Sequence, residues 1–339
     1  MTTSRRGRWL IAWPLLMLTL AAAACAGEDD VDATGDAPQT RAAGSREATP
    51  SPGCANPDAS FATLGENGKF ESGGEQRVFS IDVPPDADPT EPLPLVVNLH
   101  GALGTRQAHE NKTGLGALGR REGFITLTPQ ARGNEEGLVG RPIWDVNLPS
   151  PDVEFVDELV TEAEARLCVD SSRLYLTGFS MGAMLSQVVA CSNPDRYAAV
   201  APVAGIIDTV ACTGVEGIAL VAFHSTADED VRFDGTLDPN VERVAGSQAG
   251  PPRDQIAAEW ATRNGCGGPD QRRIGEDVEA AEFRCDRGEA VTFYSVLGAG
   301  HTWPGSAQDE QWGAATGLKT TQTIDATALM WEFFRAQSA

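Results

Sequence analysis

The stretch Gly178-Phe179-Ser180-Met181-Gly182 decides how this chain is interpreted. The residues before it, Arg173–Thr177, have the apolar composition of a strand. After it, apolar residues recur at the spacing of a buried helix face, namely Met181, Met184, Leu185, Val188 and Val189. The sequence therefore predicts a strand, a tight turn and a helix, with glycines where the turn leaves no room for Cβ atoms. Such a turn holds the central serine out at the edge of a sheet.

A G-x-S-x-G turn between a strand and a helix is the nucleophile elbow of α/β-hydrolases. The motif is short, so its flanking pattern and the rest of the chain must agree with it. Further strands are predicted at 77–83, 93–99, 124–128, 198–203, 218–223 and 290–296, and further helices at 115–122, 152–168, 253–263 and 323–335. Apolar strands that alternate with helices predict an α/β-hydrolase fold, a mostly parallel central sheet with helices on both faces.

The N-terminus has the composition of an export signal. Arg5, Arg6 and Arg8 precede an apolar run from Trp9 to Ala24, which ends in four alanines before Cys25. The run is shorter than the ~20 residues of a membrane-spanning helix, so residues 1–24 are interpreted as a signal peptide that is removed. A cysteine directly after small residues is similar to a bacterial lipobox and predicts lipidation of Cys25. Plain secretion is the alternative.

Charge limits the class of partner. The chain of 339 residues carries a formal net charge of −22, and removing the three arginines of the leader lowers it to about −25. A surface this acidic argues against nucleic acids and anionic lipids as partners. We expect an exported protein of the cell envelope, attached to the outer face of the cytoplasmic membrane only through its lipid, or a secreted one.

Residues 25–57 are rich in Ala, Gly, Pro, Ser, Thr and acidic residues, with almost no large apolar side chain. Such a segment cannot bury enough surface to offset the entropy lost on ordering, so a flexible tether is predicted. Residues 58–339 have a globular composition and a length that suits a single catalytic domain.

Six cysteines remain after Cys25, at positions 54, 168, 191, 212, 266 and 285. An even number in an exported chain predicts three disulfides, for which about 15 pairings exist. Cys266 and Cys285 fall in one polar segment and are the pair that we expect. No two of the six have the C-x-x-C spacing of a zinc site, and neither a metal nor another cofactor is predicted.

A serine hydroxyl needs a general base beside it, and the chain has four histidines. His109 lies in a polar stretch and is expected at the surface, whereas His224 ends an apolar strand and is expected to bond locally. His100 opens the loop after the strand 93–99, where it is expected to support the loop beside the substrate. His301 lies on a glycine-rich loop after the last predicted strand, and it is the predicted base.

The base in turn needs an acid that fixes its tautomer. In the chain order Ser, Asp, His, that acid follows the strand after the elbow unit. Asp228 lies within five residues of the end of the strand 218–223, and Asp230 and Asp208 are the alternatives. The predicted catalytic residues are therefore Ser180, Asp228 and His301.

Two backbone N–H groups are expected to bind the oxyanion. One belongs to Met181, the first residue of the elbow helix, where unpaired N–H groups and the helix dipole favour negative charge. The other is expected in the loop after the strand 93–99, at Ala102 or alternatively Leu103.

Several blocks of sequence together resemble one family. They are Leu99-His100-Gly101, Pro129-Gln130, Ala201-Pro202-Val203-Ala204-Gly205, His224-Ser225-Thr226-Ala227-Asp228, Asn264-Gly265-Cys266, Gly300-His301-Thr302-Trp303-Pro304-Gly305 and Trp331-Glu332-Phe333-Phe334. Between about residue 70 and residue 337 the chain is similar to the poly(3-hydroxybutyrate) depolymerase-like esterases, a group that includes feruloyl and acetylxylan esterases of carbohydrate esterase type. The resemblance implies the same three catalytic residues, Ser180, Asp228 and His301.

Aromatic residues in predicted loops are candidates for the substrate pocket. Trp144, Trp303 and Trp312 are such residues. Trp303, two positions after the predicted base, is expected together with His100 on the substrate side, with ordinary loop packing as the alternative for Trp303. Residues 229–252 are interpreted either as a solvated loop or as a flap over the site.

The sequence thus predicts an exported serine esterase that acts on short-chain, hydroxyalkanoate or polysaccharide-linked acyl esters. A dedicated feruloyl or acetylxylan esterase and an envelope acyltransferase are alternatives. A third alternative is an inactive hydrolase fold kept for binding at the cell surface.

Overall fold

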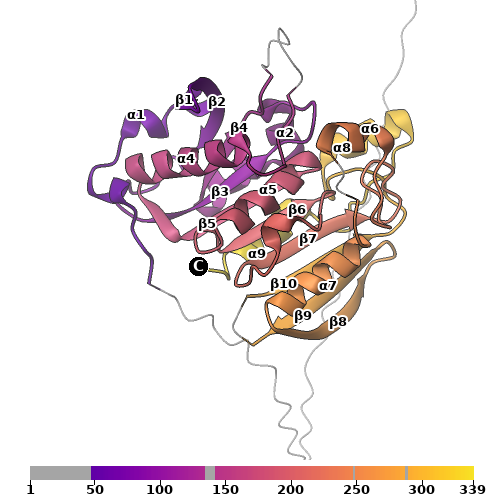
Figure 1. The fold of residues 1–339 in the computed structure, drawn as a ribbon. Helices are drawn as coiled ribbons and strands as arrows, with labels where there is room; N and C mark the ends of the chain where they lie inside the picture. Colours follow the sequence, from indigo (N-terminus) through magenta and orange to yellow (C-terminus); the bar gives the residue numbers. More distant parts are fainter. Residues whose placement is uncertain (1–46, 134–141, 247–248, 287–288) are drawn as a thin grey trace, which may run out of the picture. The chain divides into compact units, whose positions relative to one another are not determined.

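The computed structural model describes residues 47–133, 142–246, 249–286 and 289–339 (Figure 1). The predicted signal peptide, Cys25 and most of the predicted tether lie outside the described residues. Across the described ranges, no helix combines the length and the apolar character that a bilayer crossing requires.

The described residues form one ten-stranded sheet in the order β1-β2-β4-β3-β5-β6-β7-β10-β9-β8. The strands are β1 Gly68–Ser72, β2 Glu75–Asp82, β3 Leu93–Leu99, β4 Ile125–Pro129, β5 Val169–Phe179, β6 Ala199–Val203, β7 Ala219–Ser225, β8 Cys266–Ile274, β9 Val278–Cys285 and β10 Val291–Val296. From β4 to β10 in spatial order the neighbours are parallel, and antiparallel pairs extend the sheet at both ends. The predicted α/β-hydrolase architecture is confirmed.

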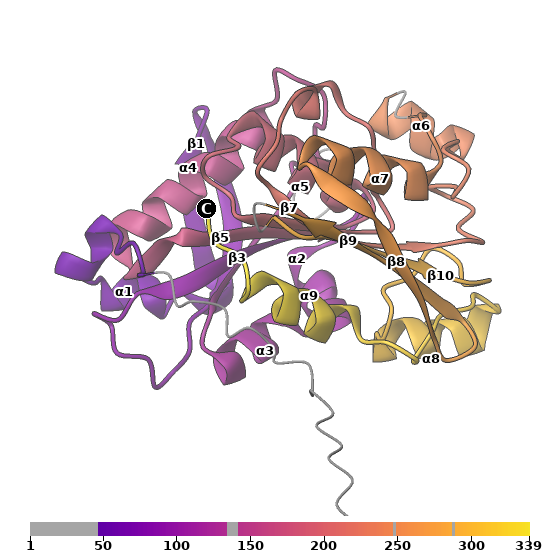
Figure 2. The ribbon, with the colours of Figure 1, turned by 90° about the horizontal axis from the view of Figure 1, so that it is seen from below.

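Helices cover both faces of this sheet (Figure 2). The helices of the described part are α1 Ala59–Ala62, α2 Arg106–Thr113, α3 Leu115–Glu122, α4 Pro151–Arg166, α5 Met181–Ser192, α6 Pro239–Ala245, α7 Arg253–Arg263, α8 Ala307–Thr316 and α9 Ala326–Phe334, with short 3₁₀ turns η1 Pro52–Ala55, η2 Gly65–Asn67 and η3 Val210–Cys212. Helices α4, α5 and α7 lie on one face, and α3, α8 and α9 lie on the other.

The central strands are buried on both sides, which explains their unbroken apolar sequences. Two separate clusters of buried side chains result, one on each face of the sheet. On the α9 side, Phe334 stacks on Tyr175 with ring centroids 4.7 Å apart, and Trp331 lies 4.1 Å from Phe124. These contacts hold the closing helix against the strand that leads to Ser180.

The domain begins earlier in the chain than the sequence indicates. The Thr49 backbone N–H donates to the Asp170 carboxylate (2.9 Å), and the Ser51 hydroxyl donates to the Leu167 carbonyl (2.8 Å). Cys54 is bonded to Cys168. Residues 49–57, expected in the tether, therefore pack on the domain, because a disulfide and backbone pairing replace the apolar side chains that this segment lacks.

The described part of the chain contains three disulfides, the number expected of an exported chain. Cys266 pairs with Cys285, as predicted, across the antiparallel strands β8 and β9. The second bond joins Cys54 to Cys168, and the third joins Cys191 in α5 to Cys212 in η3. The last one fixes the far end of the helix that begins at the elbow.

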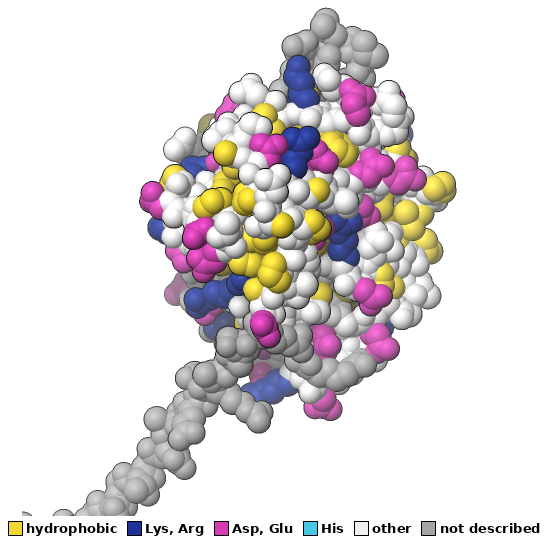
Figure 3. Space-filling model, turned by 90° about the vertical axis from the view of Figure 1, so that its left-hand side faces the viewer, with side chains coloured by type: hydrophobic (Ala, Val, Ile, Leu, Met, Phe, Trp, Pro, Cys, Tyr) yellow, Lys and Arg dark blue, Asp and Glu magenta, His cyan; other side chains and the backbone are white. Residues whose placement is uncertain are grey.

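One face of the molecule, the left-hand side of Figure 1, carries acidic, basic and hydrophobic side chains interspersed with one another (Figure 3). No histidine side chain is visible on that face.

Candidate active site

Ser180 lies between β5 and α5 in a backbone conformation that side chains rarely adopt. Its φ is 55° and its ψ is −120°. A Cβ on Gly178 would lie 2.4 Å from the Gly182 carbonyl carbon, and one on Gly182 would lie 2.2 Å from the Leu99 carbonyl oxygen. The tight approach of the helix to the neighbouring strand thus requires both glycines, and it holds the strained serine at the carboxyl edge of the sheet.

The loop after β3 lies directly beside this serine. A Cβ placed on Gly101 would be 3.4 Å from the Ser180 Cβ. In that loop the Leu103 N–H already donates to the Pro142 carbonyl (2.8 Å), which favours Ala102 over Leu103 as an oxyanion donor. On the other side Met181 is the first residue of α5, so its N–H has no acceptor within the helix.

His100 supports this loop from inside the domain. Its Nδ1 lies 2.7 Å from the Gly101 carbonyl, and its Nε2 accepts the Ala131 N–H at 3.0 Å. Burial lowers the pKa of His100 to about 4, so the ring is neutral. The ring is 1% exposed and packs on Trp144, whose indole N–H donates to the His100 carbonyl. The sequence predicted His100 on the substrate side, but the buried ring has no surface that a ligand could reach.

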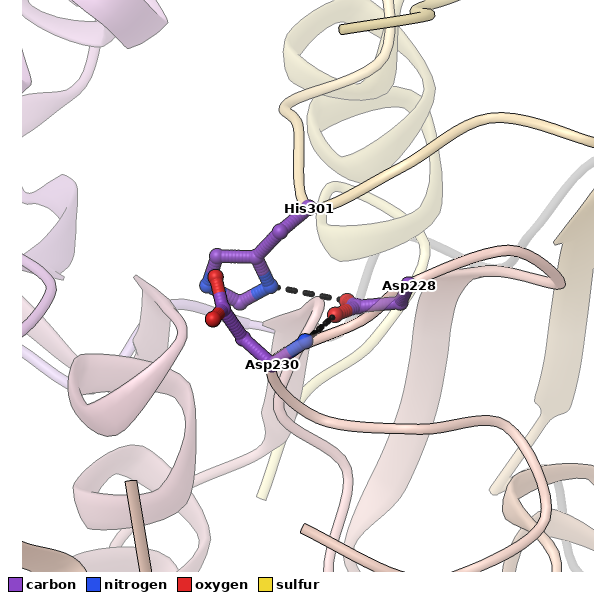
Figure 4. A group of neighbouring side chains, drawn as sticks. All are labelled: Asp228, Asp230 and His301. Carbon is purple, nitrogen blue, oxygen red and sulfur yellow. Dashed lines mark hydrogen bonds and ion pairs between the residues drawn. The ribbon is translucent and has the colours of Figure 1, made fainter. Parts of the chain in front are cut away.

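Asp228 and His301 come together because β7 and β10 are adjacent parallel strands that end at the same edge. The His301 Nδ1 lies 2.8 Å from the Asp228 Oδ2, as Figure 4 shows. The other carboxylate oxygen accepts the N–H groups of Asp230 (3.0 Å) and Val231 (2.9 Å). The acid is therefore held by its own loop and presents one oxygen to the ring.

The electrostatics of this pair favour an ionised acid. Burial acts to raise the pKa of Asp228, but the charge of His301 and its hydrogen bond lower it below the ordinary value. Burial acts to lower the pKa of His301, yet the Asp228 charge and hydrogen bond raise it overall. A carboxylate can only accept, so His301 donates from Nδ1 and its Nε2 carries the free lone pair.

The imidazole of His301 also packs on the residue next to the serine. Its centroid lies 4.7 Å from that of the Phe179 ring. The Lys112 ammonium lies over the same phenyl ring at 4.8 Å. The structure thus joins His301 directly to Asp228 and, through Phe179, to the elbow that carries Ser180.

The other two histidines are buried. His224, expected to bond locally, does so through Nε2 to the Val231 carbonyl (2.7 Å). His109, expected at the surface, is 3% exposed, and its Nε2 lies 2.7 Å from the Asn98 side-chain oxygen. The expectation for His109 was wrong, because a polar partner on β3, rather than an apolar helix face, accounts for its burial.

Trp303, expected on the wall of the substrate pocket, is 1% exposed. Its indole N–H donates to the Thr327 hydroxyl (3.0 Å), and its backbone N–H donates to the Asp309 carboxylate (2.7 Å). The structure therefore agrees with the alternative expectation, in which Trp303 packs within the protein to hold its loop. Among the three tryptophans singled out from the sequence, Trp312 is the exposed one, and it lines a cavity together with His301.

The segment 229–252 is fixed at several points within its described residues. Arg253 is 0% exposed, and its guanidinium donates to the carbonyls of Arg232 (3.0 Å), Ile206 (3.1 Å) and Thr236 (3.3 Å). Helix α6 follows within the same segment. These bonds anchor residues 232–236 to the domain.

Asp228, Asp230 and His301 are the cluster with metal-ligand chemistry among the described residues, with donor atoms within 4.8 Å of one another. Asp228 already accepts three hydrogen bonds, one of them from the His301 Nδ1, so both of its oxygens are bonded within the protein. The cluster is thus better matched to proton transfer than to ligation.

A parallel sheet with a strained serine at its carboxyl edge and an Asp–His pair beside it defines an α/β-hydrolase. The chain belongs to the poly(3-hydroxybutyrate) depolymerase esterase family, whose description is "Esterase PHB depolymerase" and whose sequence model matches residues 78–248. Membership of this family was predicted from the sequence and is confirmed.

Named relatives agree with this assignment. The chain is 31% identical to "Putative esterase NocK" of Nocardia uniformis over 252 residues, 68% of this chain and 72% of that one. It is 28% identical to "Probable feruloyl esterase C" of Aspergillus niger, over 84% of this chain and 91% of that one. It is 29% identical to "Feruloyl esterase B" of Piromyces equi over 61% of its length, but spans 39% of that protein.

Among solved structures, the acetyl xylan esterase from Aspergillus awamori superposes with a TM-score of 0.50 at 18% identity, covering 69% of this chain and 92% of that one. At this identity the likeness concerns the fold alone.

Proposed function

We propose that the protein is an exported serine esterase that hydrolyses carboxylic esters through an acyl-enzyme. The observation that carries the proposal is the hydrogen bond between Asp228 and His301 (2.8 Å) beside an elbow whose serine has a φ of 55°. The names of the relatives, esterases and feruloyl esterases, support ester substrates.

In the first step the Ser180 hydroxyl attacks the ester carbonyl while the Nε2 of His301 takes its proton. The ionised Asp228 keeps the other ring proton on Nδ1 and stabilises the imidazolium that forms. Negative charge on the carbonyl oxygen is received by the N–H groups of Met181 and Ala102. Donors of this kind each contribute about 3 kcal/mol to such reactions.

The imidazolium then gives its proton to the leaving alcohol, which departs and leaves the acyl group on Ser180. Water enters, His301 removes a proton from it, and the acid is released as the serine recovers its proton. Each of these steps uses the protein's own side chains and backbone.

The three disulfides support export, since such bonds persist in oxidising compartments. We propose a signal peptide at 1–24, a lipid on Cys25 and a tether, followed by the catalytic domain, on which the chain packs from Thr49 onward. A chain with alanine in place of Cys25 should be released into the medium, whereas the parent chain should partition with membranes.

The proposal is tested by replacing Ser180 with alanine and measuring hydrolysis of p-nitrophenyl acetate and butyrate. Activity should fall by about 10⁶-fold, as for the loss of a catalytic serine elsewhere. Reaction of the parent chain with a fluorophosphonate probe, and none of the Ser180→Ala variant, would show the nucleophile directly. A parent chain that fails to react would instead indicate an inactive binding protein.

The acceptor that takes the acyl group from the acyl-enzyme distinguishes a hydrolase from an acyltransferase. Product analysis with added glycerol or trehalose separates the two, because a hydrolase releases mainly free acid and a transferase forms new esters. A panel with methyl ferulate, acetylated xylan and a hydroxybutyrate trimer would then define the acyl specificity.

A further inference from the structure

A cavity of about 580 Å³ opens beside the catalytic base and takes no part in the steps above. We call it the base-side cavity. The side chains of this cavity that bear on a ligand are Glu229, Asp230, His301, Trp312 and Lys319. Its volume is in the range of small-molecule sites, about 300–1,000 Å³.

Trp312 is a lining residue whose position is not explained by packing in the core, because its side chain is exposed. Among the described residues four large apolar side chains are exposed, and Trp312, at 62%, is the aromatic one. Single exposed apolar residues are common on protein surfaces. This one shares a cavity with the catalytic base, so its position bears on the substrate.

The helix that carries Trp312 is firmly held. Asp309, three residues earlier in α8, is 4% exposed and accepts the backbone N–H of Trp303 at 2.7 Å. The same carboxylate forms an ion pair with Lys112 of α2, and the Ser306 hydroxyl caps the helix. The indole is therefore presented to solvent by a helix that is held in place, which lowers the entropy lost on binding a ligand.

The position of the cavity decides which part of an ester would enter it. The cavity is lined by His301 but not by Ser180. The imidazole protonates the leaving alcohol, so the alcohol part of the ester extends past the ring while the acyl part stays on the serine side. A group that reaches Trp312 thus belongs to the alcohol.

The polar groups of the cavity indicate the chemistry of that alcohol. Glu229 and Asp230 supply carboxylate acceptors and Lys319 supplies a donor. The Asp230 carboxylate lies beside the imidazole (Figure 4), with its nearest donor atom within 4.8 Å of those of Asp228 and His301. Two carboxylates against one ammonium give this cavity a net negative charge, which disfavours a carboxylate on the alcohol relative to neutral hydroxyl groups.

We propose that Trp312 determines specificity for the alcohol part of the ester, and that this part is a sugar ring that stacks on the indole. The hydroxyl groups of the ring bond to Glu229, Asp230 and Lys319. This inference rests on the proposed function, in which Ser180 carries the acyl group and His301 protonates the alcohol. It places hydroxyalkanoate oligomers with a free carboxylate among the poorer substrates.

The test uses the full chain and three acetate esters, so that the acyl group is constant: a mono-acetylated methyl xylopyranoside, ethyl acetate and 3-acetoxybutyrate. The parent chain should prefer the sugar ester. Trp312→Ala should lower the ratio of kcat/KM for the sugar ester to that for ethyl acetate about tenfold, chiefly through a higher KM. Trp312→Phe should keep most of this ratio because it keeps an aromatic face.

Val210→Ala is the matched control, because Val210 is 84% exposed and lies in η3, outside the cavity. It should leave the ratio unchanged. An unchanged ratio in Trp312→Ala, or a parent chain that prefers 3-acetoxybutyrate, overturns the inference while the esterase proposal stands. Undiminished turnover by Ser180→Ala overturns the esterase proposal itself, and the inference with it.

Discussion

Phe179 and His301 pack ring against ring, 4.7 Å between centroids, so the residue before Ser180 supports the imidazole. The two residues belong to elements 122 positions apart in the sequence. This ring contact and the hydrogen bond to Asp228 together restrict the orientation of the imidazole.

Removing that surface should impair catalysis more than binding. Phe179→Leu keeps an apolar side chain but loses the flat ring, so the imidazole is less well oriented. We expect kcat to fall about 10- to 100-fold, because small misplacements of catalytic groups cost about this much, with KM little changed. Steady-state kinetics with p-nitrophenyl acetate check this, and a loss confined to KM would contradict it.

The acid should be identified by a pair of amide variants. Asp228→Asn leaves the shape of the site intact but allows the wrong tautomer of His301, so kcat should fall about 10⁴-fold. Asp230→Asn alters the neighbouring carboxylate, which has no hydrogen bond to the ring, and should cost far less. An equal loss of kcat in the two variants would contradict the assignment of Asp228, rather than Asp230, as the acid.

The pH profile should depend on two charges that act on His301 in opposite senses. Activity needs the neutral ring, so it is lost as the pH falls through the pKa of His301, which lies above its ordinary value. Asp230 raises this pKa and Lys112 lowers it. Asp230→Asn should therefore move the acid limb of kcat/KM to lower pH, and Lys112→Gln should move it to higher pH.

Asp228 is hydrogen-bonded to this ring, and the His224 Nε2 lies 3.8 Å from the same carboxylate; both residues are unchanged in the two variants. Shifts in the same direction for Asp230→Asn and Lys112→Gln would contradict the electrostatic account. High salt should reduce both shifts in part, because both charges are only partly buried and salt screens charges that solvent reaches.

The disulfides should differ in their contribution to stability. Cys54–Cys168 closes a loop with a sequence separation of 114, and Cys266–Cys285 one of 19. Chain entropy assigns about 4.7 kcal/mol to a loop of 100 residues and about 3 kcal/mol to one of 15. Replacing the first pair by serines should lower the unfolding free energy more than replacing the second, as measured by denaturant titration.

The central strands and the elbow helix could be predicted from the sequence because they are buried on both sides and consist mainly of apolar residues. Strand β3 and helices α3 and α7 have the predicted bounds. Strand β8 was not expected, since nearly all its residues are exposed and a disulfide and pairing with β9 hold it. Helix α8 has few apolar residues, and a single buried carboxylate, Asp309, attaches it to its neighbours.

Site residues on strand ends could be predicted from chain order, whereas side-chain exposure could not. Trp303 and Trp312 look alike in sequence, each in a stretch rich in glycine and polar residues. Trp303 is buried and donates a hydrogen bond to Thr327 of α9, whereas Trp312 projects from the surface of a helix. Only contacts between distant segments separate them, and neither composition nor spacing encodes those contacts.

The entry of the chain into the domain at Thr49 and Ser51 has a consequence for the proposed lipid anchor. These residues bond to Asp170 and Leu167, at the start of β5, while Ser180 follows the end of that strand, about 33 Å away for its 11 residues. If Cys25 carries the proposed lipid, the anchor is connected to the domain at the amino end of β5, whereas Ser180 follows the carboxyl end of the same strand. Tension on the anchor would then act on the edge of the sheet opposite to the one at which the ester is proposed to react.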